Sequence, residues 1–144
     1  MVVYMSIMRI LGIDYGAKRI GTAVSDELEI AAHALSVIER KNQNSDLEAI
    51  SKIIETYLIE KIVVGYPLRL DGTEGIQCEK VNRFIERLTA AFKVPVVKWD
   101  ESLSTWAADE IMSEAGLKRG KKKKIVDKIA AGIILQSYLD RQRK

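Results

Sequence analysis

Residues 9–25 read RILGIDYGAKRIGTAVS, and this stretch decides the fold. An apolar run from Arg9 to Asp14 is closed by Tyr15-Gly16, and a second run, Ile20 to Ser25, follows after a few polar residues. Two such runs around a short turn that contains glycine predict a β-hairpin. A third run over about residues 32–39 extends the hairpin into a three-stranded meander.

Beyond the meander, helical and strand patterns alternate. Ser45-Asp46-Leu47-Glu48 fits a capping box, and apolar residues recur after it at helical spacing. The expected elements are, in order, a helix capped by Ser45, a strand over 61–66, a helix over 76–92, a strand over 95–99, a helix from Ser104 to Gly116 and a helix over 125–139.

This order of elements predicts an α/β fold with a five-stranded mixed sheet. Right-handed crossovers place the fourth strand beside the first, so the expected strand order is 3-2-1-4-5, with helices on both faces. A chain of 144 residues, 47% of them apolar, can form one core, and we expect residues 1–144 to be a single domain. The carboxyl ends of strands one, four and five then meet, and open α/β sheets place their sites at such ends.

The net charge of +3 is unevenly distributed along the chain. Residues 1–117 carry a net charge of −5, whereas residues 118–144 carry +8. Six of the ten cations in the second part lie in residues 118–124, which we expect to form a basic loop. This asymmetry is typical of a protein with a polyanionic partner, and the alternative is a solvated loop that only increases solubility.

No feature of the sequence indicates a membrane or an oxidising compartment. The longest apolar run, Ile129 to Leu135, is too short to span a bilayer, and the single cysteine, Cys78, cannot form an intramolecular disulfide. Residues 1–8 lack the pattern of a signal peptide. We therefore expect a cytoplasmic protein without a membrane partner.

Carboxylates occur at three places where they are costly. Asp14 ends a half-buried strand face, Asp100 and Glu101 follow the fifth strand, and Asp127 precedes the apolar stripe of the last helix. Each has a structural interpretation as well. Asp14 could bond the backbone two residues further on, and the other three could lie near helix N-termini, with Asp127 in a first helical turn.

Acids brought to one end of a sheet repel one another unless a cation neutralises them. Oxygen ligands favour Mg²⁺ or Mn²⁺ over zinc, and the lone His33 and lone Cys78 cannot form a zinc site. Two such ions about 4 Å apart suit phosphodiester hydrolysis. The glycine-bracketed segment from Gly65 to Gly75, which contains Arg69, offers a phosphate-binding loop or a plain connection.

Four blocks of sequence resemble the motifs of one family. Leu11 to Gly21, with Ala23-Val24-Ser25-Asp26 after it, resembles the opening motif of the YqgF/RuvX family, the Holliday junction resolvase-like nucleases. The other blocks are Val63 to Pro67 with Asp71 to Gly75, Asp100-Glu101 before a helix rich in Ser and Thr, and Val126 to Ala131. The resemblance covers nearly all of residues 8–139, and residues 1–7 are an extension.

The resemblance implies a ribonuclease H-like fold and a metal-dependent nuclease whose acids are Asp14, Glu101 and Asp127, with Asp100 as the alternative third acid. It also implies a role in maturing the 5′ end of pre-16S rRNA in ribosome biogenesis, with structured RNA or the pre-ribosomal particle as partner. Holliday junction resolution on branched DNA ranks second, and a non-catalytic nucleic-acid-binding module third. An actin-like ATPase would need two domains of this kind.

The family's third motif usually contains an arginine where this chain has Ser102. Lys18, Arg19 or Arg69 would then supply the missing positive charge. We expect Lys121 to Lys124 to be a mobile clamp that delivers a phosphate backbone to the metal site. The expected nucleic-acid contacts are therefore Lys18, Arg19, Arg69, Lys121, Lys122, Lys123 and Lys124, with Gly65, Gly72 and Thr73 as the phosphate loop.

Overall fold

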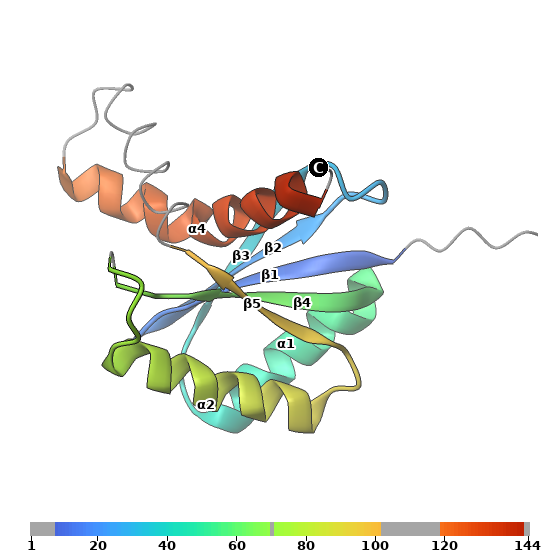
Figure 1. The fold of residues 1–144 in the computed structure, drawn as a ribbon. Coiled ribbons are helices and arrows are strands. Elements are labelled where there is room, and N and C mark those ends of the chain that lie inside the picture. The colour runs from blue at the N-terminus through green and yellow to red at the C-terminus, as the bar shows by residue number, and fades with distance from the viewer. Residues whose placement is uncertain (1–7, 70, 102–118, 143–144) are drawn as a thin grey trace, which may run out of the picture.

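The structure, a computed structural model, describes residues 8–69, 71–101 and 119–142, and for residues 119–128 it describes the backbone alone. Five strands and three helices lie in these ranges (Figure 1). In chain order they are β1 (Arg9–Tyr15), β2 (Arg19–Ser25), β3 (Ala32–Glu39), α1 (Gln43–Tyr57), β4 (Ile59–Tyr66), α2 (Ile76–Ala91), β5 (Val96–Asp100) and α4 (Arg119–Gln142). The helix expected over 104–116 lies outside the described residues.

The strands form one mixed sheet in the order β3-β2-β1-β4-β5, which confirms the predicted order. β1 pairs with β2, and β2 with β3, in antiparallel fashion, whereas β1–β4 and β4–β5 are parallel pairs. The register shifts once between β1 and β4, at Arg9/Ile10, and is then regular from Ile10 to Ile13. The carboxyl ends of β1, β4 and β5 therefore lie at one edge of the sheet.

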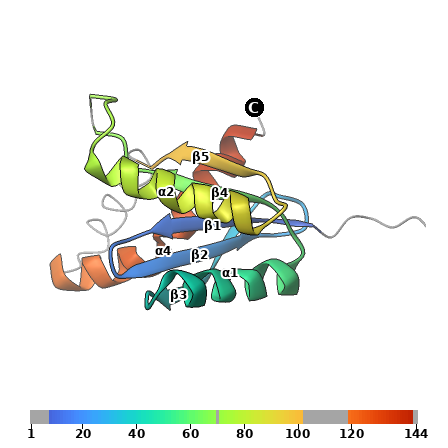
Figure 2. The same ribbon diagram turned by 90° about the horizontal axis from the view of Figure 1, so that it is seen from below.

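Helices cover both faces of the sheet (Figures 1 and 2). On the face covered by α1 and α2, alternate residues of β1 enter a large core that includes Leu11, Ile13 and Tyr15. On the α4 face, Ile10 packs in a smaller core with residues such as Leu135. A Cβ atom at Gly12 would lie 2.7 Å from the Leu135 Cβ, so this glycine lets α4 approach the sheet closely.

Helix α1 begins earlier than the capping-box prediction placed it. Asn42 is its N-cap: the Asn42 side chain accepts a hydrogen bond from the Ser45 amide at 2.9 Å, and the Ser45 hydroxyl accepts one from the Asn42 amide. Ser45 is thus the third residue of the helix and not its cap. The prediction was wrong because asparagine caps as well as serine does and stands three residues earlier.

Helix α4 also begins earlier than predicted, at Arg119 and not at residue 125. Residues 119–124 of the expected basic loop are helical, which corrects the prediction of a mobile loop there; residue 118 lies outside the described residues. Lysine is a good helix former, so the helix extends back through the run despite Gly120. Neither α4 nor any other described helix is long and apolar enough to cross a membrane.

Candidate active site

Asp14 lies at the carboxyl end of β1, on the α4 face of the sheet. It follows Ile10 and Gly12 at the two-residue period of a strand, and both of those residues contact α4 or its core. The Gly16 amide, which a turn aspartate at position 14 would use, donates instead to the Arg19 carbonyl at 2.9 Å. This amide therefore takes part in the hydrogen bonding of the β1–β2 turn.

Glu101 follows β5 and extends over Gly65 of β4. The Glu101 amide donates to the Tyr66 carbonyl at 3.2 Å, which continues the β4–β5 pairing by one residue. A Cβ atom at Gly65 would lie 2.5 Å from Glu101 Oε2 and 2.7 Å from Ile134 Cδ1 of α4. The Glu101 carboxylate thus occupies the space that a side chain on β4 would fill, on the same face as Asp14.

The strand register explains why these two acids affect each other. In the β1–β4 ladder Ile13 pairs with Val64, so Asp14 and Gly65 are next to each other at the end of the ladder. Burial raises the pKa of Glu101 to about 7, and the charges of Asp14 and Asp100 raise it as well. Glu101 is therefore a partly buried carboxyl group whose ionised form is opposed by two neighbouring acids.

The other two predicted acids differ in what the structure describes of them. Asp100 ends β5 opposite Tyr66, and it is exposed. Asp127 is the ninth residue of α4, one turn before Ala131, whose carbonyl faces Gly12. This position contradicts the interpretation of Asp127 as a first-turn residue held by the helix dipole. Its side chain lies outside the described residues.

No group of three or more His, Cys, Asp or Glu side chains that could hold a metal ion is found within the described ranges. His33 is exposed on β3 and Cys78 is buried in α2. At the carboxyl ends of β1 and β5, the described carboxylates are those of Asp14, Asp100 and Glu101.

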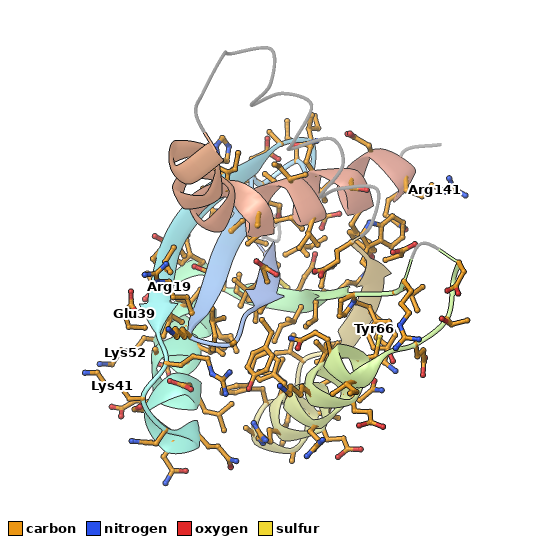
Figure 3. The ribbon with its side chains drawn as sticks, turned by 90° about the vertical axis from the view of Figure 1, so that its left-hand side faces the viewer. Arg19, Glu39, Lys41, Lys52, Tyr66 and Arg141 are labelled. Carbon is orange, nitrogen blue, oxygen red and sulfur yellow. The ribbon has the colours of Figure 1, made fainter. Side chains whose placement is uncertain are left out.

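The described cations that are predicted to contact nucleic acid lie on separate elements and differ in their contacts. The Arg19 Nε atom forms an ion pair with Glu39 Oε1 at 3.2 Å across the β2–β3 pair (Figure 3). Lys18 is exposed in the β1–β2 turn. The Arg69 guanidinium lies against Gly75, with its Nε atom 3.1 Å from the position of a Cβ there. The side chains of Lys121 to Lys124, and Ser102, lie outside the described residues.

The loop after β4 uses its own backbone amides. The Arg69 amide donates to the Thr73 carbonyl, and the Gly72 amide, at a φ of +85°, donates to the Arg69 carbonyl. The Thr73 amide and hydroxyl both donate to Asp71 Oδ1, and these bonds lower the pKa of Asp71. The amides of Gly72 and Thr73 thus donate hydrogen bonds within the turn in this structure, and the phosphate-binding role of the loop stays a prediction. Gly65 is buried below Glu101 instead of lining the loop.

Two features of this site were not identified from the sequence. Gly65 was assigned to a phosphate loop, although a glycine inside a strand is itself a signal of close approach by another group. The hydroxyl of Tyr66 donates to Glu74 at 3.0 Å and accepts from Asn82, which ties the loop to α2. Burial raises the pKa of Tyr66 to about 12, so the phenol serves as a neutral hydrogen-bonding group.

A family model matches residues 8–141, and its description is "RuvX: Holliday junction resolvase". A protein of Syntrophus aciditrophicus named "Putative pre-16S rRNA nuclease" is 57% identical over 133 residues, which are 92% of this chain and 89% of that protein. A protein of the same name from Halothermothrix orenii is 47% identical over 137 residues, 95% of this chain and 98% of that protein.

Solved structures of resolvases share the fold at low sequence identity. RuvC of Thermus thermophilus, in complex with a Holliday junction substrate, matches with a TM-score of 0.55 and 17% identity over 94% of this chain and 96% of that chain. The fowlpox virus resolvase, in complex with Holliday junction DNA, matches with a TM-score of 0.51 and 13% identity over 95% of this chain and all of that chain. The fold is therefore that of the RuvC-like resolvases, which is ribonuclease H-like.

Proposed function

Because this chain belongs to the RuvX family, it is a nuclease that hydrolyses phosphodiester bonds, and we propose that its substrate is the precursor of 16S rRNA, cleaved with a divalent metal ion at Asp14, Glu101 and Asp127. The family's description and the relatives' name support the activity. The substrate rests on the shared name of relatives with up to 57% identity over most of the chain.

The observation that supports this site best is the position of the Glu101 carboxyl group above Gly65 and beside Asp14. The carboxyl group lies over a glycine, is partly buried, and is opposed by the charge of Asp14. A fold that needed Glu101 only for stability would gain by pairing it with a cation or exposing it to water. Two mutually repelling carboxylates beside a strand end that carries a glycine are typical of a functional site.

The donor chemistry at this edge fits Mg²⁺ or Mn²⁺. Both ions prefer carboxylate oxygens, and Asp14 and Glu101 supply such oxygens at neighbouring strand ends. Asp14 and Glu101 would hold the ion, together with Asp127 from α4. Such ions, when bound, activate a water molecule and stabilise the leaving oxygen.

The chain itself contributes the positions of the acids. Gly12 lets α4 approach β1 closely, and Gly65 leaves space for the Glu101 side chain beside the end of β4. Trp99 Nε1 donates to the Ser137 hydroxyl at 3.1 Å and fixes β5 against α4. Glu101 directly follows β5, and Asp127 belongs to α4, so this bond constrains the two elements that carry these acids.

The proposal is tested with pure protein in a cleavage assay on a pre-16S rRNA fragment and on a four-way DNA junction, with Mg²⁺ or Mn²⁺. We expect RNA cleavage that stops in EDTA, and a loss of at least about 1000-fold in Asp14→Asn, Glu101→Gln and Asp127→Asn, as for other removals of essential catalytic groups.

Asp140→Asn is the matched control, because Asp140 is an exposed aspartate of the same helix α4. Full activity is expected for this variant. Unchanged cleavage by Asp14→Asn would show that the metal site is elsewhere, and cleavage of the junction but not of the RNA would replace the proposed substrate with branched DNA. A matching loss in Asp100→Asn but not in Glu101→Gln would transfer the role to Asp100.

A further inference from the structure

A basic groove lies on the face of the sheet opposite the acids. It has a volume of about 250 Å³, and its lining is made of the β1–β2 turn, Arg40 and one stripe of helix α2. The lining residues are Tyr15, Gly16, Ala17, Arg40, Gln77, Lys80, Arg83 and Arg87. Four of them are cations and none is acidic, so the groove is a concentrated positive surface.

Arg40 is held in a fixed position at one side of the groove. Its Nη1 atom donates to the carbonyls of Gly16 and Ala17, each at 2.9 Å, and its guanidinium lies 4.4 Å from the centre of the Tyr15 ring. Tyr15 in turn stacks on Phe84 of α2, with ring centroids 4.1 Å apart and an angle of 15° between the rings. Arg40, Tyr15 and Phe84 therefore form a rigid stack that connects the turn to α2.

The cations of α2 that line the groove form no ion pairs among the described residues. Arg40 has Asp46 at 3.8 Å, but no ion pair joins Lys80, Arg83 or Arg87 to another described residue. The three are spaced by three and four residues along the helix, and Glu79 and Glu86 stand at the same spacings from Arg83. Lys80 and Arg87, at the two ends of this group, are therefore the cations best placed to pair with a bound anion.

The size and polarity of the groove indicate which kind of anion fits. Pockets for small-molecule ligands are larger, about 300 Å³ or more, and mostly apolar. A short, strongly cationic groove along a helix suits consecutive phosphates of a polymer backbone. One end of the groove is formed by Tyr15, which directly follows Asp14 in β1. A nucleic-acid strand bound in the groove would therefore reach the edge of the sheet where the acids lie.

We propose that this groove binds the phosphodiester backbone of a nucleic-acid strand. The groove lies on the opposite face of the sheet from the acids, so the phosphates that it binds are not those of the bond that is cut. The proposal rests on the nuclease function proposed above. It assigns substrate binding to Arg40, Lys80, Arg83 and Arg87, none of which the sequence analysis identified.

The test compares two triple variants that lose the same charge. Lys80→Gln/Arg83→Gln/Arg87→Gln removes the α2 cations of the groove, and Lys52→Gln/Lys93→Gln/Arg141→Gln removes three exposed cations elsewhere, two of them labelled in Figure 3. Binding of a fluorescent pre-16S rRNA fragment, and in a second arm of a four-way DNA junction, is measured by anisotropy in EDTA at several salt concentrations. Thermal unfolding checks that both variants fold.

We expect the groove variant to bind at least about tenfold more weakly, and the slope of log K against log salt to fall by about 2 for a single strand, because each lost phosphate contact contributes about 0.7. The control variant keeps an affinity close to wild type. Equal losses in both variants, or no loss in the groove variant, would overturn the proposal. The arm that shows the larger change identifies RNA or DNA as the ligand.

Cleavage separates this proposal from the proposed function. At saturating RNA the groove variant is expected to keep its kcat and to show a raised KM, whereas Asp14→Asn shows the reverse. If wild-type protein cut no RNA at all, the proposed RNA substrate would be wrong, and the binding comparison in EDTA would still decide whether the groove binds nucleic acid.

Discussion

Asp14 and Tyr15 are neighbours in β1, yet their side chains leave the sheet on opposite faces and meet different surroundings. On the α4 face, the strands present glycines, and the carboxylate of Glu101 occupies the space above Gly65. On the α1/α2 face, the Tyr15 ring lies between Phe84 and Arg40. At this end of β1, aromatic packing stabilises the α1/α2 face, whereas the α4 face keeps two repelling acids close together.

This difference separates stability from chemistry within one strand. Aromatic stacking and a buried core fix β1 from one side. The fixed strand then holds Asp14 in place on the side where electrostatics oppose the arrangement. A site with unfavourable interactions is typical of functional regions, and it is tolerated only when other parts of the fold compensate.

A substitution on the α1/α2 face, where Tyr15 stacks on Phe84, should have the largest effect on stability. Phe84→Ala removes the ring that stacks on Tyr15 and leaves a cavity in the core, so we expect the free energy of unfolding to fall by about 3–5 kcal/mol in a denaturant titration. Ile76→Ala, which truncates a 72% exposed residue of the same helix, should change it by less than about 0.5 kcal/mol. Equal effects of the two would show that the stack does not support β1.

A substitution on the α4 face, beside Glu101, should lower the cleavage activity more than it lowers the stability of the fold. In Gly65→Ala the new methyl group meets Glu101 Oε2 and Ile134 Cδ1, which are ends of flexible side chains and can move away. We expect pre-16S rRNA cleavage to fall about 100-fold because the carboxylate is displaced, a loss of about 2.7 kcal/mol in transition-state stabilisation. The thermal unfolding midpoint should change little.

Gly132→Ala is the control for this substitution. A Cβ atom at Gly132 in α4 meets Ala34 N at 3.8 Å and Ala23 Cβ at 4.0 Å, which are ordinary contacts. Alanine in a helix interior should stabilise the protein by about 0.5–1 kcal/mol and leave cleavage unchanged. If Gly65→Ala were as active as Gly132→Ala, the space above Gly65 would not matter for catalysis.

The repulsion between Glu101 and its neighbouring acids should make the stability of the protein depend on pH. Since the pKa of Glu101 is raised from 4.5 to about 7, the folded state binds more protons than the unfolded state between these values. The unfolding free energy therefore falls as the pH rises through this window. For a partly buried group we expect a loss of about 2 kcal/mol between about pH 5 and pH 8, measured in EDTA.

Glu101→Gln removes the titrating group, so this loss should disappear and the variant should be more stable than wild type at about pH 8. Glu55→Gln, at an exposed glutamate of α1, should keep the wild-type pH dependence. A Glu101→Gln variant that still lost the same stability would show that Glu101 is not the strained group.

Much of the fold follows from the sequence because its signals are local. The alternation in β1 and the helical spacing after residue 45 predicted the strand order and the helices. The start of α4 was missed because charge was taken as evidence for a loop, although lysine favours helices. The start of α1 was missed because two possible capping residues stand three positions apart.

The site was only partly predictable because its contacts are not local. The sequence indicated Asp14 and an acid after β5, but the position of the Glu101 carboxylate above Gly65 depends on the pairing of β4 with β5. Arg40 is separated by more than twenty residues from the carbonyls that it contacts, and no motif links them. Such contacts arise only when the sheet is assembled.

The register shift at Arg9/Ile10 has a practical consequence for handling the protein. Since side chains alternate along a strand, a slip of β1 by one residue would exchange Asp14 and Tyr15 between the two faces. The extra residue of this shift, Glu60, belongs to β4, so β1 itself pairs regularly with its neighbours up to Asp14. A fusion tag placed ahead of β1 should therefore leave Asp14 and Tyr15 on their present faces of the sheet. A single residue inserted between Ile10 and Asp14 should move each of them to the opposite face.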